Sequence, residues 1–352
     1  MAERLRVAVL FGGRSGEHEV SLTSAANVMA ALEGAGCEVL PIGIDRAGRW
    51  LPSPEAHALL SEGRQFDGLP PGQALARVAE RSPLDVVFPV LHGPYGEDGS
   101  LQGLLEMAGL PYVGCGVLAS ALAMDKVMSK RVFREQGLPV GDYTWLRMTD
   151  WSDDARREVE RVCGYPCFVK PANLGSSVGV SKARDPAELE VAVRKAARYD
   201  TKIVVERTVP DAREIECSVL GNEQPEASVP GEIVPSREFY DYAAKYLDGT
   251  SELLVPAPLP ADFAARVQSL AVQAFQALDC SGMARVDFLL SRTTGELFLN
   301  ELNTIPGFTA ISMYPKLWEA SGVPLQRLVE RLIELAMERH AARAGLSTAS
   351  DD

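Results

Sequence analysis

Two polar stretches in the last quarter of the chain, residues 285–287 and 300–303, carry side chains suited to a divalent metal ion. If both stretches are strands, alternation places Arg285 with Asp287 on one face, and Glu301 with Asn303 on one face. Two carboxylates and a carboxamide then converge. Such hard oxygen donors suit Mg²⁺ on the phosphates of a nucleotide, because Mg²⁺ keeps waters and takes few protein ligands. The alternative is a cross-strand ion pair between Arg285 and Glu301.

The turn between these strands decides which side chains meet. A turn over residues 291–295 would pair Leu290 with Glu296 and set Arg285 opposite Glu301, with Asp287 on the diagonal. A one-residue slip would not separate the two carboxylates by face. The prediction is therefore that they lie close together.

A small-residue loop at 175–179 follows a predicted strand and offers backbone N–H groups and hydroxyls to phosphate oxygens. It is not a Walker A loop, and a plain hairpin tip is the alternative. Lys126 and Lys170 would act with it as phosphate clamps, or be solvated surface lysines. Glu206 and Glu214 are candidates for an adenine amine and ribose hydroxyls, but their spacing also fits surface carboxylates.

The glycine loop at residues 12–16 lacks the dinucleotide spacing G-x-G-x-x-G. Glu17 and Glu19 follow it and would repel a pyrophosphate but attract an ammonium group. The alternative is a capped loop with solvated glutamates. A second loop, residues 92–99, is expected at the same edge of the sheet, so both are candidate walls of a site.

The predicted secondary structure that positions these groups has two different patterns in the two parts of the chain. Apolar runs at 5–11, 37–44 and 85–91 alternate with helical patterns at 21–32 and 101–107, which predicts a doubly wound parallel sheet. The later part mixes helices with antiparallel strands, at 165–170, 180–183, 202–206, 214–220, 284–290 and 296–302, and closes with a helix at 325–337. The fold class is α/β combined with α+β.

The length and net charge of the chain limit the classes of protein to which it can belong. A chain of 352 residues is expected to form two or three domains. Its net charge of −13 disfavours nucleic acid and anionic lipid as partners. The sequence lacks an apolar run of the roughly 20 residues that a membrane span needs, and we expect a cytoplasmic protein. Its six cysteines and four histidines show no zinc spacing, so the cysteines are expected to be reduced.

Taken in order, these stretches resemble the D-alanine:D-alanine ligase family of the ATP-grasp superfamily. The family-like stretches are residues 11–21, 91–103, 124–126, 170–179, 238–246 and 300–312. The resemblance implies a three-domain ATP-grasp architecture in which two domains clasp ATP. The expected domains are residues 1–118 (doubly wound, substrate-binding), 119–206 (lid), 207–340 (catalytic) and a disordered tail at 341–352.

The resemblance also implies a reaction. ATP would phosphorylate the carboxylate of one D-alanine, and a second D-alanine would attack the acyl phosphate to give D-alanyl-D-alanine for peptidoglycan precursors. Two Mg²⁺ (or Mn²⁺) ions and a homodimer are expected.

The roles that the resemblance carries over are as follows. ATP would contact Lys126, Lys170, Ser176, Ser177, Glu206, Glu214 and Lys245, and the metal ions would bind Asp287, Glu301 and Asn303. The two amino acids would contact Glu17, His92, Arg285, Ser312 and the amide of Met313. Glu17, Ser176 and Tyr246 would close the site, and Arg285 with the Gly307 N–H would stabilise the oxyanion.

Three alternatives stay open at this stage. A D-alanine:D-lactate ligase or another ATP-grasp carboxylate–amine ligase would share most of these residues, although Lys245 and Tyr246 resemble the dipeptide-forming type. A nucleotide-binding regulator that has lost catalysis would have retained the metal and oxyanion residues without using them. A dehydrogenase is disfavoured because its nucleotide fingerprint is missing.

Overall fold

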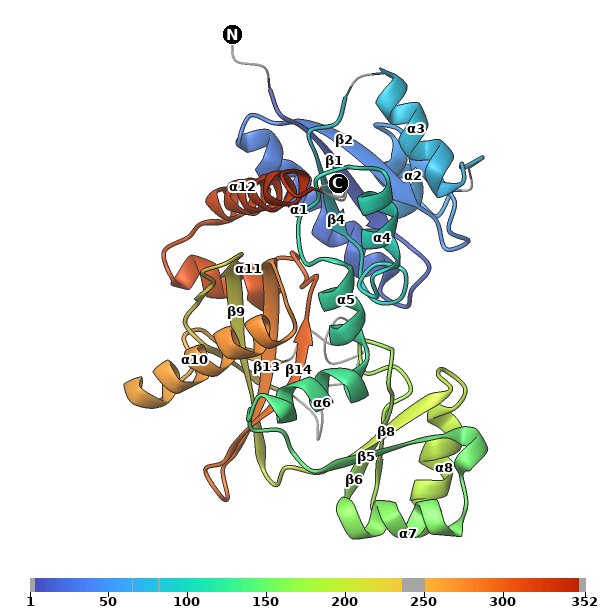
Figure 1. Ribbon diagram of the computed structural model, residues 1–352, viewed down its shortest axis with the longest axis vertical. Helices are drawn as coiled ribbons and strands as arrows, with labels where there is room; N and C mark the ends of the chain where they lie inside the picture. Colours follow the sequence, from blue (N-terminus) through green and yellow to red (C-terminus); the bar gives the residue numbers. More distant parts are fainter. Residues whose placement is uncertain (1–3, 65, 82, 236–250, 348–352) are drawn as a thin grey trace.

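The computed structural model describes residues 4–64, 66–81, 83–235 and 251–347. Within these ranges the strands form three sheets that follow one another along the molecule (Figure 1). Among the described helices, none is long and apolar enough to cross a membrane.

The first sheet has the order β3-β2-β1-β4, with β1 parallel to both β2 and β4. Its strands are β1 (Arg6–Gly12), β2 (Glu38–Ile44), β3 (Trp50–Pro52) and β4 (Val86–Val90). Val9 and its neighbours two residues away face α1 (His18–Gly34) and α2 (Ala56–Ser61), whereas Leu10 faces α3 (Pro71–Arg81) and α4 (Ser100–Met107). The predicted doubly wound sheet is confirmed, with β3 added antiparallel at one edge.

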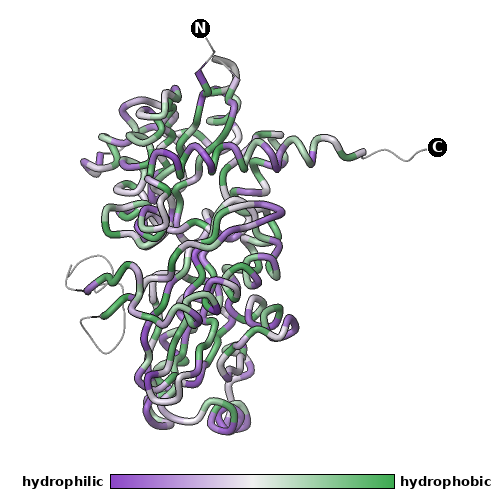
Figure 2. The backbone as a smooth tube through the Cα atoms, turned by 90° about the vertical axis from the view of Figure 1, so that its left-hand side faces the viewer, coloured by the Kyte–Doolittle hydropathy of each residue, from purple (hydrophilic) through white to green (hydrophobic). Residues whose placement is uncertain are grey.

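The closing helix α12 (Leu325–Ala344) returns to this first sheet and packs beside α1. Leu328, Leu332 and Ile333 are buried in the same core as Val7 and Phe88. The helix runs beyond residue 340, where a disordered tail was expected. Arg339 and Arg343 on its last turns contact the first domain, as described below, and Figure 2 shows the end of the helix projecting beyond the body of the molecule.

The second sheet is antiparallel and has the order β5-β8-β6-β7. It consists of β5 (Tyr143–Arg147), β6 (Cys167–Pro171), β7 (Ser181–Ala183) and β8 (Lys202–Arg207), and it packs with α7 (Asp153–Val162) and α8 (Pro186–Ala196). The 3-10 turn η1 (Met148–Asp150) follows β5. Val169 pairs with Ser181, so the predicted hairpin is confirmed and the small-residue loop forms its tip.

The third sheet is also antiparallel, in the order β12-β11-β9-β13-β14 with β10 paired to β9. Its strands are β9 (Ala212–Gly221), β10 (Glu226–Ala227), β11 (Gly231–Val234), β12 (Glu252–Leu254), β13 (Gly282–Ser291) and β14 (Leu297–Asn303). One face packs against α5 (Val117–Met124), α6 (Lys126–Glu135) and α10 (Ala261–Ala277). The opposite face contacts α11 (Met313–Ala320), where Ser218 Oγ donates to the Tyr314 carbonyl at 3.4 Å.

The register of β13 and β14 differs from the prediction. Leu290 pairs with Leu297 instead of Glu296, and Arg285 lies opposite Asn303 instead of Glu301. Two causes combine. The turn is closed one residue later, by Ser291 N–H to the Glu296 carbonyl at 2.9 Å, and a bulge follows between Asp287 and Phe288. The bulge sets Asp287 directly opposite Glu301, so the predicted proximity holds.

The division into three domains stays a prediction, and one of the three sheets falls in each proposed segment. The helices α5 and α6 fall in the proposed lid segment, yet their apolar residues Ala123 and Phe133 pack in the core of the third sheet. The second sheet with α7 and α8 has a separate core.

Candidate functional site

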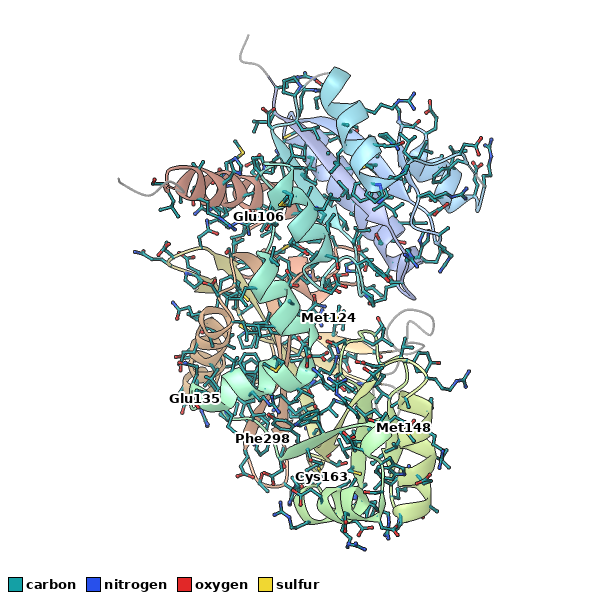
Figure 3. The ribbon with its side chains drawn as sticks, turned by 45° about the vertical axis from the view of Figure 1, so that its right-hand side comes forward. Glu106, Met124, Glu135, Met148, Cys163 and Phe298 are labelled. Carbon is teal, nitrogen blue, oxygen red and sulfur yellow. The ribbon has the colours of Figure 1, made fainter. Side chains whose placement is uncertain are left out.

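Two neighbouring pockets lie where the three sheets meet. The smaller, of about 110 Å³, opens between the first and third sheets; the larger, of about 450 Å³, lies between the second and third. Lys126, Gly175, Ser176 and Glu301 line both. In Figure 3, Met124, which lines the smaller pocket, lies at the end of α5 between the upper and lower parts of the molecule.

Most of the predicted site residues line these pockets. Those on the smaller pocket are Glu17, His92, Lys126, Ser176, Arg285, Glu301, Asn303, Gly307, Ser312 and Met313. Those on the larger one are Lys126, Lys170, Ser176, Ser177, Glu206, Glu214 and Glu301. Asp287 is not among the described lining residues of either pocket, and Lys245 and Tyr246 lie outside the described residues.

The glycine loop after β1 fixes the position of Glu17. Gly12 has φ +92°, and a Cβ at this position would meet the Ile44 carbonyl oxygen at 2.2 Å, so no side chain fits. Gly12 N–H donates to Ser21 Oγ at 2.7 Å, which ties the loop to the first turn of α1. Glu17 directly precedes that helix and points into the smaller pocket.

The tip of the second sheet's hairpin closes over Glu17. A Cβ built on Gly175 would lie 3.2 Å from Glu17 Oε2, and Lys126 Nζ donates to the Leu174 carbonyl at 2.8 Å. Ser176 has φ +52°, and its buried hydroxyl has no hydrogen-bond partner within the described part of the chain. Such an unsatisfied hydroxyl on the wall of two pockets is suited to a polar ligand.

His92 presents one nitrogen to the smaller pocket as an acceptor. Its Nδ1 lies 2.9 Å from the Ile305 carbonyl, so Nδ1 carries the proton and donates. Burial lowers the pKa of His92, which favours the neutral ring. The buried Nε2 has no hydrogen-bond partner among the described residues.

Glu97 is a pocket residue that the sequence prediction missed. Its side chain accepts from Gly93 N–H at 2.6 Å and from Ile305 N–H at 3.2 Å, which joins the first domain to the end of β14. Burial, and next the charge of Glu17, raise the pKa of Glu97 to about 8, against the effect of these donors. Its place in the 92–99 loop was the only sequence signal.

Arg285 is held by two carboxylates on the floor of the smaller pocket. Its Nε and Nη2 donate to Asp287 at 2.7 Å each, and Nε lies 3.0 Å from Glu216 Oε2. The sequence prediction weighed an Arg285–Glu301 pair and did not single out Glu216. Glu216 lies opposite Asp287 on β9, a contact between strands that are far apart in sequence.

On the larger pocket, Glu206 is paired with two lysines. Lys170 Nζ lies 2.6 Å from Glu206 Oε2, and Lys130 Nζ lies 3.0 Å from Oε1. Burial alone would raise the pKa of Glu206, but Lys130 and Lys170 hold it down at about 2. Lys130 was not predicted.

The loop that carries Gly307 and Ser312 is anchored to α1. Asn27 Nδ2 donates to the Phe308 carbonyl at 2.8 Å, and Phe308 N–H donates to Ser24 Oγ at 3.1 Å. A Cβ on Gly307 would lie 2.7 Å from Ser312 Oγ, so a larger residue there would displace the Ser312 side chain. Ser312 directly precedes α11, so the first N–H groups of this helix face the pocket wall.

The oxygen donors proposed to bind metal supply only some of the ligands that a magnesium ion needs. The phosphates of a bound nucleotide would supply others. Asp287 and Glu301 are direct cross-strand neighbours, while Asn303 Oδ1 accepts from Ile305 N–H at 3.1 Å. Lys126 Nζ lies 3.6 Å from Glu301. In the described part of the chain, no three His, Cys, Asp or Glu side chains gather to hold a metal. Mg²⁺ accepts a site with few protein ligands, in which phosphate oxygens and water molecules complete the coordination.

A doubly wound sheet followed by two antiparallel sheets, with a lysine-lined pocket between the latter two, defines an enzyme of the ATP-grasp architecture. The model of the D-ala D-ala ligase N-terminus matches residues 6–115, and that of the C-terminus matches residues 132–334. The chain belongs to the D-alanine–D-alanine ligase family, and it is a ligase.

Individual relatives agree. A D-alanine–D-alanine ligase from Thermoanaerobacter sp. (strain X514) is 53% identical over 96% of this chain and 98% of its own, and one from Heliobacterium modesticaldum is 52% identical over 95% of both. The D-alanine–D-alanine ligase structure from Coxiella burnetii has a TM-score of 0.83 at 39% identity, covering 97% of each chain. The VanG D-Ala:D-Ser ligase from Enterococcus faecalis has a TM-score of 0.81 at 34% identity, covering 95% of this chain and 100% of its own.

Proposed function

We propose that this protein joins two D-alanine molecules into D-alanyl-D-alanine, with ATP as the phosphoryl donor, for peptidoglycan precursors. The observation that carries the proposal is the common wall of the two pockets. Lys126, Ser176 and Glu301 line both, so a triphosphate in the larger pocket would end beside a small zwitterion in the smaller one. Phosphoryl transfer requires this proximity.

The smaller pocket suits two amino acids. The Glu17 carboxylate would hold the ammonium group of the first D-alanine, with His92 Nε2 beside it as an acceptor. Arg285 would face its carboxylate. The N-terminus of α11, at Ser312 and Met313, would receive the second carboxylate, because free N–H groups there favour an anion.

The larger pocket suits ATP. Lys126, Lys170 and the backbone around Ser176 would hold the phosphates, with Ser177 beside them. Glu206 and Glu214 would accept from the adenine amine and the ribose. Magnesium or manganese ions at Asp287, Glu301 and Asn303 would neutralise phosphate oxygens during transfer.

The reaction then has two steps. The carboxylate of the first D-alanine attacks the γ-phosphorus, and the bond to ADP breaks, giving an acyl phosphate. The second D-alanine loses its ammonium proton and attacks the acyl carbon. A carbon–nitrogen bond forms and inorganic phosphate leaves. Arg285 and the Gly307 N–H would stabilise the intervening oxyanion, while the hairpin tip keeps water out.

Tyr246 and Lys245 are proposed to complete the closed site. Both lie in the segment 236–250, which the structure does not describe. The homodimer and the cytoplasmic location also stay predictions.

The test is phosphate release from ATP and Mg²⁺ with D-alanine or with L-alanine, using the wild type and Glu301→Gln. We expect release with D-alanine only, and a loss of at least about a hundredfold in Glu301→Gln, because one metal-binding charge is removed. Product analysis with D-serine and D-lactate as competing acceptors separates the related ligases. Release that ignores the stereochemistry of alanine would overturn the proposal.

A further inference from the structure

Lys130 is a buried cation for which the proposed chemistry has no use. Its side chain is 4% exposed, and it is not among the described residues that line the pockets. Its Nζ lies 3.0 Å from Glu206 and donates to the Asn300 carbonyl at 3.0 Å. Desolvation of an ammonium group is costly, so a lysine at this depth must be compensated by its partners.

The two lysines on Glu206 differ in what else they can reach. Lys170 lines the larger pocket and lies 2.6 Å from Glu206, whereas Lys130 projects from α6 behind the carboxylate and reaches β14. A phosphate in the larger pocket therefore competes with Glu206 for Lys170. It does not compete for Lys130.

We infer that Lys130 is a fixed counter-ion that keeps Glu206 paired when Lys170 moves from Glu206 to the phosphates of the nucleotide. The inference rests on the proposed function. Without Lys130, the exchange would leave Glu206 as a buried anion with the neutral adenine amine in place of a cation, and the cost of desolvation would oppose binding. Lys130 is thus a positioning residue that acts through Glu206 and does not touch the nucleotide.

The chain contains a matched control for the loss of a buried ion pair. Glu232 is 3% exposed and also pairs with two cations, Arg213 at 2.6 Å and Arg292 at 3.4 Å. None of these three is among the described lining residues of the two pockets of the candidate site. Arg213→Gln therefore weakens a comparable pair at a site with no expected role in nucleotide binding.

The test is a double-mutant cycle on ATP affinity. Dissociation constants for Mg²⁺-ATP are measured by calorimetry for the wild type, Lys130→Met, Glu206→Gln and the double variant, with thermal unfolding in parallel. We expect Lys130→Met to raise the dissociation constant about tenfold in the wild-type background and less than about twofold in the Glu206→Gln background. Arg213→Gln should lower the unfolding temperature but leave ATP affinity unchanged.

A second variant, Lys130→Gln, keeps a donor for the Asn300 carbonyl and removes only the charge. It should reproduce the Lys130→Met effect on affinity. Equal effects in both backgrounds, or a change in unfolding temperature without a change in affinity, would overturn the inference. Failure of the wild type to bind ATP would instead count against the proposed function.

Discussion

Burial and neighbouring charge act on Glu97 in the same direction. Both favour the protonated carboxyl, with a pKa of about 8 in the folded protein against 4.5 for an ordinary glutamate. The folded state therefore binds the proton more tightly than the unfolded state. The stability that Glu97 contributes is fully present below about pH 4.5 and is lost as the pH rises towards 8.

Glu97→Gln should remove this pH dependence, because an amide stays neutral. Gly93 N–H and Ile305 N–H bond to different oxygens of Glu97, so the amide keeps one of the two bonds and the variant starts from a lower stability at low pH. We expect the free energy of unfolding of the variant to gain on the wild type steadily between pH 5 and pH 8. Urea unfolding at four pH values measures this. Parallel curves for the two proteins would mean that Glu97 is ionised in the folded state.

The sequence revealed the polar residues that line the pockets far better than their buried partners. Glu17 directly precedes α1, Lys126 begins α6, and Glu301 lies near the end of β14, and each belongs to a recognisable polar stretch. Glu216 and Lys130 sit inside a strand and a helix, and their partners lie on other elements. Nothing local distinguishes such residues from surface charges.

At the scale of elements, α1 positions a loop from the other end of the chain. Asn27 and Ser24 hold both backbone groups of Phe308, next to Gly307. The Phe308 ring in turn packs against Phe88 of β4, with ring centroids 6.0 Å apart, and against Tyr314 of α11 at 5.7 Å. The loop is therefore fixed by the first and third domains together.

Asn27→Ala should weaken this loop without affecting the nucleotide pocket. Loss of the bond to a half-buried carbonyl is expected to cost about 1–2 kcal/mol and to raise the KM for D-alanine severalfold, with the KM for ATP unchanged. Steady-state kinetics with each substrate varied in turn measures the split. Thr23→Ala on the exposed face of the same helix is the control, because the Thr23 hydroxyl donates to the Glu19 carbonyl of its own helix. An equal rise in both KM values would contradict the assignment.

Strands and helices with a clear hydrophobic periodicity were predicted from the sequence, but the pairing register of β13 and β14 was not. A bulge depends on how both strands fit the sheet, and Asp287 and Phe288 give no local sign of one. The helix α5 was also missed, because its apolar composition carries no helical period and it follows Gly116 directly.

At the scale of the whole molecule, a hydrophobic core joins the first sheet and α12 to Met283 and Phe308 of the third domain, which has a second core on one face of its own sheet, whereas the core of the second sheet is separate. Arg339 on α12 reinforces the union, because Nη2 donates to the Tyr112 carbonyl at 3.1 Å, Nη1 bonds to the Gly114 carbonyl, and the guanidinium lies 4.2 Å from the Tyr112 ring centroid. Arg343 adds an ion pair with Glu106 at 2.7 Å. We expect these two domains to unfold together.

Leu332→Ala, at a fully buried position of α12, tests this expectation. It should cost about 2–5 kcal/mol. Native-state hydrogen exchange should accelerate in β1 and β4 as well as in α12, while exchange in β6 and β8 stays as in the wild type. Faster exchange confined to α12 would show that the shared core does not act as a unit.

The placement of α12 also has a consequence for synthesis on the ribosome. Strands β1, β2 and β4 emerge early and can pair at once. Part of the apolar surface on one face of their sheet stays exposed until residues 325–336 of α12 are made. The first sheet is thus completed by a helix that is made after the strands of the other two sheets. Until α12 emerges, that face is an apolar surface of the nascent chain that a chaperone would have to protect.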